Sequence, residues 1–317
     1  MNLAMLLISV FTFVQFNCEN LFDFRHDCLK EDIEFTPEGK RRWTPRKYRN
    51  KLDNITKVIT SCGMEAGEWR LPDMVALCEV ENDSVMNDLT RRSPLRNLGY
   101  EFAITNSPDT RGIDVALLWH PGSFAMIRNY AIGVRMNDGE RPTRDILYAC
   151  GRTASGDTLH VFVVHAPSRY GGNKLTRPRR MAVTDRLNMA VDSIRRQCAE
   201  PKIIISGDFN DYYDSPIFDK LNSNGLVNVS TNAIGDNGAK ATYKYKGEWK
   251  SIDHIFISRN LMTRLRSCRI NDLPFLLEDD LKYGGVKPFR TSNGYKYQNG
   301  YSDHLPLVMK LEQNKLK

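Results

Sequence analysis

The sequence lacks the features that mark several large classes of protein. It has no CxxC pair, and its seven cysteines are scattered and odd in number, which argues against a disulfide framework and against a zinc knuckle. It has no internal repeat, no low-complexity tract and no Pro-, Gly- or Ser-rich linker. No apolar run is long enough for a transmembrane helix. We therefore expect one folded domain over residues 10–317, without a stable membrane span.

Acidic residues are in the minority. There are 38 Asp and Glu against 45 Lys and Arg, which gives a net charge of +7. A basic surplus favours polyanionic partners such as nucleic acid or acidic lipid. Many enzymes with uncharged substrates are equally basic, so the charge serves only to choose between functions that other features support.

The first sixteen residues are almost wholly apolar but lack a basic start and a small-residue cleavage site. Residues 10–16 lead directly into a polar motif described below, so they belong to the folded domain. Residues 1–9 are either the remnant of an export signal or the beginning of the same strand, and the sequence leaves both readings open. We prefer an exported location over a cytoplasmic one, and expect a monomer.

Short apolar runs rich in β-branched residues alternate with helical patterns. Residues 48–62 and 179–198 carry apolar side chains at spacings of three and four, as on one face of a helix. A further helix is predicted to start at Asp214-Ser215-Pro216 and to stop at Gly225. The predicted strands are Val10–Phe16, Met74–Val80, Val115–Trp119, Leu159–Val164, Lys202–Ser206, Ile252–Ser258 and Leu305–Leu311. Because several strands follow one another without a helix, we expect an α/β (α+β) fold with two mixed sheets packed together and helices outside.

Polar residues follow six of these runs at the point where each strand ends or begins. Strand ends on one edge of a layered α/β protein meet at a crevice, so groups far apart in sequence can converge there. The residues concerned are Asn17, Glu79, His165, Asp208, Asn210, Asp253, Asp303 and His304. Each alone is also typical of a turn, a solvated strand end or a half-buried histidine. Six such sites together favour a shared function.

The chemistry of these residues is coherent. Carboxylate and amide oxygens suit Mg²⁺, Mn²⁺ or Ca²⁺, and the scarcity of soft ligands makes zinc a poorer fit. A histidine near a buried acid can act as acid or base near neutral pH. Asn210 can donate a hydrogen bond to a phosphoryl oxygen. This combination fits the hydrolysis of a phosphate ester.

The chain resembles the endonuclease/exonuclease/phosphatase superfamily. The matching segments are FNCENLF (16–22), LCEVEN (77–82), VVHAPSR (163–169), GDFND (207–211), SIDHIFI (251–257) and YSDHLPL (301–307). They occur in the family's order and span residues 16 to 308. The resemblance implies a deoxyribonuclease I-like fold, which is a four-layer sandwich of two packed mixed β-sheets flanked by helices.

The resemblance also implies a role for each motif residue. Glu79 would be the principal metal ligand, with Asn17 and Asp303 completing the shell. Asp208 would position or deprotonate the attacking water, and Asn210 would hold the phosphate.

The remaining roles implied by the resemblance concern histidines and the substrate phosphate. His304 would be the catalytic histidine, oriented by Asp253, and His165 would contact the phosphate or assist the leaving oxygen. Arg169 would touch the substrate phosphate, and Asp114 would orient the ring of His165.

Three functions compete. The first is a metal-dependent phosphodiesterase acting on nucleic acid. The second is another phosphoesterase of the same fold, either a phosphatase or a sphingomyelinase-like lipid phosphodiesterase with residues 274–277 as its membrane-docking loop. The third is a catalytically silent module that binds nucleic acid through basic segments 40–42, 46–51 and 177–180. A silent module has no need of Glu79, Asp208 and His304 together, which favours an enzyme.

Overall fold

The computed structural model describes residues 9–65, 68–137 and 139–313. The alternatives for the start of the chain concern residues 1–9, of which residues 1–8 lie outside this range and Ser9 is the first residue of strand β1. Two six-stranded sheets dominate the described part, and short hairpins and helices surround them.

The first sheet has the strand order β15-β20-β1-β4-β6-β5. Its long central strand β1 pairs antiparallel with β20 and parallel with β4, so the sheet is mixed. The strands are β1 (Ser9–Leu21), β4 (Met74–Val80), β5 (Glu101–Ile104), β6 (Asp114–Trp119), β15 (Leu265–Ile270) and β20 (Leu307–Gln313).

The second sheet has the order β11-β14-β10-β9-β8-β7 and is also mixed. Its strand β10 pairs parallel with β9 and antiparallel with β14. The strands are β7 (Phe124–Ile132), β8 (Ile146–Thr153), β9 (Thr158–His165), β10 (Lys202–Asp208), β11 (Leu226–Asn228) and β14 (Asp253–Ser258).

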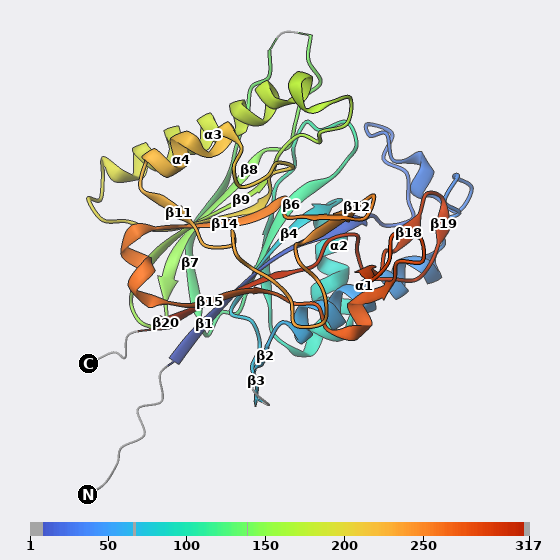
Figure 1. The fold of residues 1–317 in the computed structure, drawn as a ribbon, viewed down its shortest axis with the longest axis horizontal. Coiled ribbons are helices and arrows are strands. Elements are labelled where there is room, and N and C mark those ends of the chain that lie inside the picture. Colours follow the sequence, from blue (N-terminus) through green and yellow to red (C-terminus); the bar gives the residue numbers. More distant parts are fainter. Residues whose placement is uncertain (1–8, 66–67, 138, 314–317) are drawn as a thin grey trace, which may run out of the picture.

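Helices cover the outer face of each sheet, which gives four layers (Figure 1). Helix α1 (Pro45–Ser61) packs its buried face on the first sheet, and Thr44 caps its N-terminus. Helix α3 (Asn173–Arg195), with the short α4 (Asp219–Ser223), lies on the outer face of the second sheet. The fold expected from the sequence is therefore confirmed.

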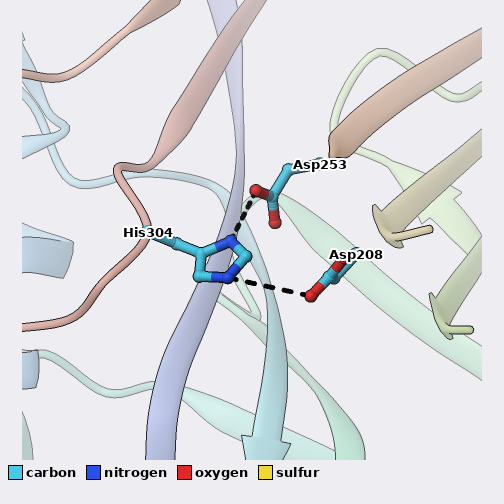
Figure 2. A group of neighbouring side chains, drawn as sticks. All are labelled: Asp208, Asp253 and His304. Atoms are coloured by element: carbon cyan, nitrogen blue, oxygen red, sulfur yellow. Dashed lines mark hydrogen bonds and ion pairs between the residues drawn. The ribbon is translucent and has the colours of Figure 1, made fainter. Parts of the chain in front are cut away.

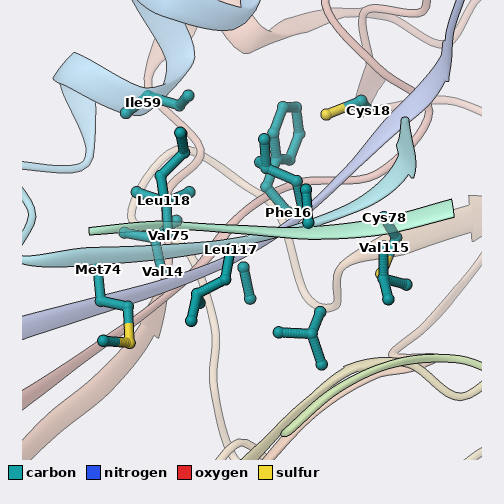
Figure 3. Packing of buried hydrophobic residues seen from close by; sticks show 14 of the residues in the cluster. Val14, Phe16, Cys18, Ile59, Met74, Val75, Cys78, Val115, Leu117 and Leu118 are labelled. Carbon is teal, nitrogen blue, oxygen red and sulfur yellow. The ribbon is translucent and has the colours of Figure 1, made fainter. Parts of the chain in front are cut away.

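The inner faces of the two sheets form one apolar core. Figure 3 shows part of this core around β1, β4 and β6, including Met74, Cys78 and Leu117. Two polar contacts cross between the sheets inside it. The Ser206 hydroxyl donates to Gln15 Oε1 at 3.0 Å, and the Cys78 thiol donates to the carbonyl of Val164 at 3.2 Å. These contacts join β1 to β10 and β4 to β9 directly behind the strand ends.

All seven predicted strands are present, although β1 runs five residues beyond its predicted end. The helix start at Pro216 is a 3₁₀ turn that leads into α4, and Gly225 follows that helix with a φ of 67°. Five strands of the two sheets were missed. Exposed polar residues hide the pattern in β5, β7 and β15, and β8 and β11 were missed as well. The candidate docking loop at residues 274–277 is a 3₁₀ turn and a strand start packed on the core, with Leu276 2% exposed.

Candidate active site

Three of the predicted residues lie side by side at one end of the second sheet. Asp208, the last residue of β10, is paired with His165 of β9 on one side and Asp253 of β14 on the other. The preceding Gly207 makes this alignment feasible, because a Cβ there would lie 1.9 Å from the carbonyl oxygen of Val164. Regular strand pairing therefore places a histidine and two carboxylates in one row.

The first sheet contributes Asn17 and Glu79 through irregular backbone. The pairing of β1 with β4 and of β4 with β6 is interrupted by bulges at these positions. Glu79 has a φ of 63°, and Glu19 and Asn20 have φ values of 51° and 57°. Bulges redirect side chains, and left-handed backbone at non-glycine residues is concentrated at functional sites. The strain here lies on the side that would hold a metal.

His304 and Asp253 form a hydrogen-bonded pair. His304 Nδ1 lies 2.7 Å from Asp253 Oδ2, and the same oxygen accepts a hydrogen bond of 2.7 Å from the Thr242 hydroxyl. His304 Nε2 points toward Asp208, 3.9 Å from Oδ2 (Figure 2). Burial opposes protonation of His304, but the carboxylates of Asp253, Asp303 and Asp208 outweigh it and raise its pKa well above the usual value. His304 is therefore held as a cation.

Asp208 stands at the centre of the site. Its side chain accepts a 3.0 Å hydrogen bond from Asn17 Nδ2 and a 2.8 Å bond from the backbone N–H of Asn210. Burial, followed by repulsion from Asp253, raises its pKa to about 7. A carboxylate with a pKa near neutrality is suited to accept a proton from water.

His165 faces the same space in its neutral form. Its Nε2 lies 3.7 Å from Asp208 Oδ2 and 3.8 Å from Glu79 Oε1. Burial, with the nearby cations Arg144, Arg111 and His304, lowers its pKa well below the usual value. Arg144 also fixes the backbone, because its guanidinium donates to the carbonyl of His165 at 3.2 Å.

The structure does not bring Asp114 to His165, contrary to the prediction. Asp114 accepts hydrogen bonds from Thr105 and from the N–H of Ser107, while His165 Nδ1 has no partner among the described residues. The bulge that follows Cys78 displaces the end of β4 and leaves Asp114 to organise its own loop.

Asn210 lies beside the row, in left-handed backbone with a φ of 52°. Its amide Nδ2 donates to the carbonyl of Ala166 at 3.1 Å, so one N–H is used and the other remains for a ligand. Arg169, predicted to touch the substrate phosphate, instead stacks its guanidinium 4.1 Å from the centre of the Tyr212 ring. No hydrogen bond or ion pair joins it to the other site residues within the described chain.

Asp303 is part of a second group of charges. Arg290 Nη2 donates to Asp303 Oδ2 at 2.9 Å, and Arg290 Nε lies 3.5 Å from Glu19 Oε1. Burial and repulsion from Asp303 raise the pKa of Glu19 to about 7. In this arrangement Asp303 binds a guanidinium, whereas the sequence predicted a metal ligand.

Sequence reasoning missed four contributors: Thr242, Arg144, Arg290 and the role of Glu19. Thr242 and Arg290 come from loops with no strand-end pattern, and the hydrogen bonds of Arg144 to the site go to the backbone carbonyls of His165 and Ala166. Glu19 did carry a signal, since it lies two residues after Asn17 at the end of an apolar run.

The donor set fits a divalent cation bound by oxygen. The carboxylates of Glu79 and Asp208 and the amide of Asn17 converge, and burial with repulsion from Asp253 makes the negative charge of Asp208 costly. Asp208, Asp253 and His304 have ligand atoms within 4.8 Å of one another. Asp253 and His304 are hydrogen-bonded to each other, however, so we assign the metal to the Glu79 side of Asp208.

Comparison with known proteins agrees with this geometry. A model of the endonuclease/exonuclease/phosphatase family matches residues 12–313. The chain belongs to this family. It is a metal-dependent hydrolase of phosphate esters. No curated protein matches the chain in sequence.

Solved structures of the same family share the fold. The endonuclease/exonuclease/phosphatase from Bacteroides vulgatus is 14% identical, with a TM-score of 0.61 over 96% of this chain and 100% of that one. The mannosyl-6-phosphatase of Bacteroides thetaiotaomicron is 14% identical, with a TM-score of 0.60 over 94% and 98%. The catalytic domain of human Nocturnin is 16% identical, with a TM-score of 0.59 over 96% and 94%. At this identity the likeness shows the fold alone. No helix in the described ranges is long and apolar enough to cross a membrane.

Proposed function

We propose that the protein hydrolyses phosphodiester bonds, with nucleic acid as its substrate and Mg²⁺ or Mn²⁺ as its cofactor. One observation carries the proposal. The row of His165, Asp208 and Asp253 on the second sheet faces Asn17 and Glu79 of the first sheet, and His304 lies against Asp208.

The roles follow from what each group can reach. Glu79, with Asn17, would hold the divalent ion, which supplies Lewis-acid polarisation of a phosphoryl oxygen when bound. Asp208 orients the attacking water and accepts its proton. Asn210 has a free amide N–H for a phosphoryl oxygen.

The two histidines act as different kinds of group. The hydrogen bond from Nδ1 to Asp253 fixes the His304 ring, so its Nε2–H is directed at the reacting phosphate beside Asp208. His165 is neutral and lies between Glu79 and Asp208, where it can bind the phosphate or assist the leaving oxygen.

Nucleic acid is favoured as the substrate by the net charge of +7. Four exposed basic side chains on residues 40–49 have no ion pair with an acid among the described residues, namely Lys40, Arg42, Arg46 and Arg49. The structural relative TDP2 from Caenorhabditis elegans, 17% identical, is a further fold match.

A sugar phosphate is the second candidate. A groove of about 670 Å³ is lined by the aromatic rings of Phe24 and Tyr295 and by Glu31, Glu34 and Glu38. Aromatic faces with carboxylates suit a sugar, and a mannosyl-6-phosphatase shares the fold. The segment that carries Tyr295 also contacts the site, because Thr291, four residues before it, donates its N–H to Glu19.

The test is a substrate panel with Mg²⁺ or Mn²⁺: plasmid DNA, RNA, mannose 6-phosphate, sphingomyelin and bis(p-nitrophenyl) phosphate. We expect cleavage of nucleic acid and of the aryl diester, abolished by EDTA and restored by added metal. Glu79→Gln should raise the metal concentration needed for half-maximal activity, because one anionic ligand becomes neutral. Full activity in excess EDTA would refute the mechanism, and activity on mannose 6-phosphate alone would refute the proposed substrate.

A further inference from the structure

Arg290 lies between two acids, one of which is Asp303, the residue before His304. It lies 2.9 Å from Asp303 Oδ2 and 3.5 Å from Glu19 Oε1, and 41% of its side chain is exposed. The acids themselves are more enclosed, with side-chain exposures of 18% for Asp303 and 8% for Glu19. The guanidinium is therefore anchored on its inner side and open on its outer side.

The anchor is rigid. Glu19 Oε2 accepts a 2.6 Å hydrogen bond from the N–H of Thr291, the residue that follows Arg290. The buried ammonium of Lys51 binds the Thr291 hydroxyl, and it donates to the carbonyl of Tyr301 at 2.7 Å. On the other side, the Tyr301 N–H donates to the carbonyl of Phe289 at 2.7 Å. The backbone is thus held on both sides of Arg290, which lowers the entropic cost of binding a ligand.

Tyr243 adds a second hydrogen-bond donor next to His304. An isolated β-bridge pairs its backbone with that of His304, and the two rings lie 5.0 Å apart. Its hydroxyl has no hydrogen-bond partner among the described residues. Burial and the carboxylate of Asp303 raise the pKa of Tyr243 to about 12, so the phenol keeps its proton at neutral pH.

Neither group is explained by the stability of the fold alone. A partly exposed ion pair contributes little to stability. The guanidinium is bound to Asp303, the neighbour of His304 in the chain, and the phenol ring lies against His304. Both therefore present N–H or O–H donors to a ligand at the site. Guanidinium geometry matches a phosphate with two parallel hydrogen bonds.

We propose that Arg290 and Tyr243 form a phosphoryl-binding pair of the active site, in which Glu19 and Asp303 hold the guanidinium in place. The ligand class is the phosphate group of the substrate and of the product. This inference rests on the proposed function, and it gives to Arg290 the role that the sequence had suggested for Arg169.

The experiment measures phosphate binding and turnover separately. Isothermal titration of inorganic phosphate into the full-length protein with MgCl₂ gives affinity without catalysis. Steady-state hydrolysis of bis(p-nitrophenyl) phosphate gives kcat and KM, and titration of MnCl₂ gives metal affinity. The variants are Arg290→Met, Arg290→Lys and Tyr243→Phe. Arg91→Met is the matched control, since Arg91 is 45% exposed and is also paired with an acid, Glu101.

We expect Arg290→Met to weaken phosphate binding by about 10–100-fold, the loss typical of a hydrogen bond to a charged group. Tyr243→Phe should weaken it by about 2–10-fold, as for a neutral hydrogen bond. Arg290→Lys should keep the ion pairs, and hence the fold, but lose the two parallel hydrogen bonds to phosphate. Its phosphate affinity should therefore lie between those of the wild type and Arg290→Met. Arg91→Met should match the wild type, and Mn²⁺ affinity should change less than about threefold in every variant.

Unchanged phosphate affinity in both Arg290 variants would overturn the inference. So would a parallel loss of Mn²⁺ affinity in Arg290→Met, which would mean that Arg290 only positions Asp303. If neither the wild type nor any variant hydrolyses an ester, but Arg290→Met still loses phosphate affinity, the inference stands and the proposed function fails. If esters are hydrolysed equally well by wild type and Arg290→Met, with equal phosphate affinity, only the inference fails.

Discussion

The two sheets supply their halves of the site in different ways. The second sheet delivers His165, Asp208 and Asp253 through uninterrupted pairing, so their positions follow from strand register. The first sheet delivers Asn17 and Glu79 next to bulges and left-handed backbone. Strand register is enough to align side chains that act on one another in a row. Side chains that surround a metal ion need a backbone that bends toward the ion, as the bulges of the first sheet do.

The largest expected effect concerns a pair that joins the two sheets: Asp253 on the regular second sheet, and His304 from the loop before β20 of the first sheet. His304→Ala should lower kcat by about 10²–10⁴-fold, the usual worth of a positioned acid or base. Asp253→Asn should resemble it, and the double variant should lose little more, because the pair acts as a unit. Single-turnover rates on bis(p-nitrophenyl) phosphate measure the effect. Near wild-type rates in His304→Ala would remove His304 from the mechanism.

The second test places one methyl group in the regular side. Gly207→Ala should destabilise the protein by about 2–3 kcal/mol, because its Cβ would clash with the Val164 carbonyl oxygen at 1.9 Å and separate β9 from β10. Urea unfolding gives the free energy. Gly156→Ala, in the β8–β9 turn with a φ of 85°, is the control for the cost of backbone strain alone. Equal losses in both variants would mean that strand contact at Gly207 is not the cause.

The third test uses strand alternation on the regular side. His254 follows Asp253 and is fully buried, with Nε2 2.9 Å from the carbonyl of Asp211. Burial lowers its pKa below the usual 6.5, so the folded state resists protonation. Stability from the neutral ring is present above about pH 6.5 and is lost as the pH falls through the folded-state pKa.

The comparison is between the wild type and His254→Asn. The variant should lose stability more gently on acidification, by up to about 1.4 kcal/mol per pH unit for one proton. His120→Asn, at a less buried histidine, serves as the control. Urea unfolding from pH 7 to 5 is the measurement, and parallel curves for wild type and His254→Asn would contradict the assignment.

The smallest test probes strain on the bulged side. Asn20 has a φ of 57°, and its N–H donates to Glu79 Oε2 at 2.9 Å. Asn20→Gly should therefore be more stable than Asn20→Ala by about 1 kcal/mol, since only glycine adopts this backbone without cost. Asn129 in β7 is exposed and its φ is not positive, so there the alanine variant should be more stable than the glycine variant. The same order at both positions would argue against strain at the site.

The same contrast explains which parts of the molecule the sequence could predict. Strand ends on the second sheet were visible because β-branched runs such as Lys202–Ser206 stop abruptly at Asp208. The core helix faces followed from spacing, and α1 buries Tyr48, Leu52, Ile55 and Ile59 as expected. Regular structure leaves a periodic trace in the sequence, and the fold could be predicted from it.

The loops left no such trace. Arg290 reaches Asp303 from a turn thirteen residues earlier, and Arg144 reaches the carbonyl of His165 across 21 residues. Such contacts depend on how long side chains cross a folded surface, which spacing cannot encode. Asp114 shows the opposite error, because a polar residue at a strand start was read as part of the site while it stabilises its own loop.

The hydrogen bond between Gln15 and Ser206 has a consequence for the distance between the two halves of the site. Apolar faces attract one another without fixing their lateral position, so two sheets joined only by such faces can slide. Gln15 and Asn17 lie two residues apart on the same face of β1, and they bind Ser206 and Asp208, which are two residues apart on β10. These two hydrogen bonds therefore fix the lateral position of one sheet on the other. Sliding of the layers would have to break both before the metal ligands could move away from His165, Asp208 and Asp253.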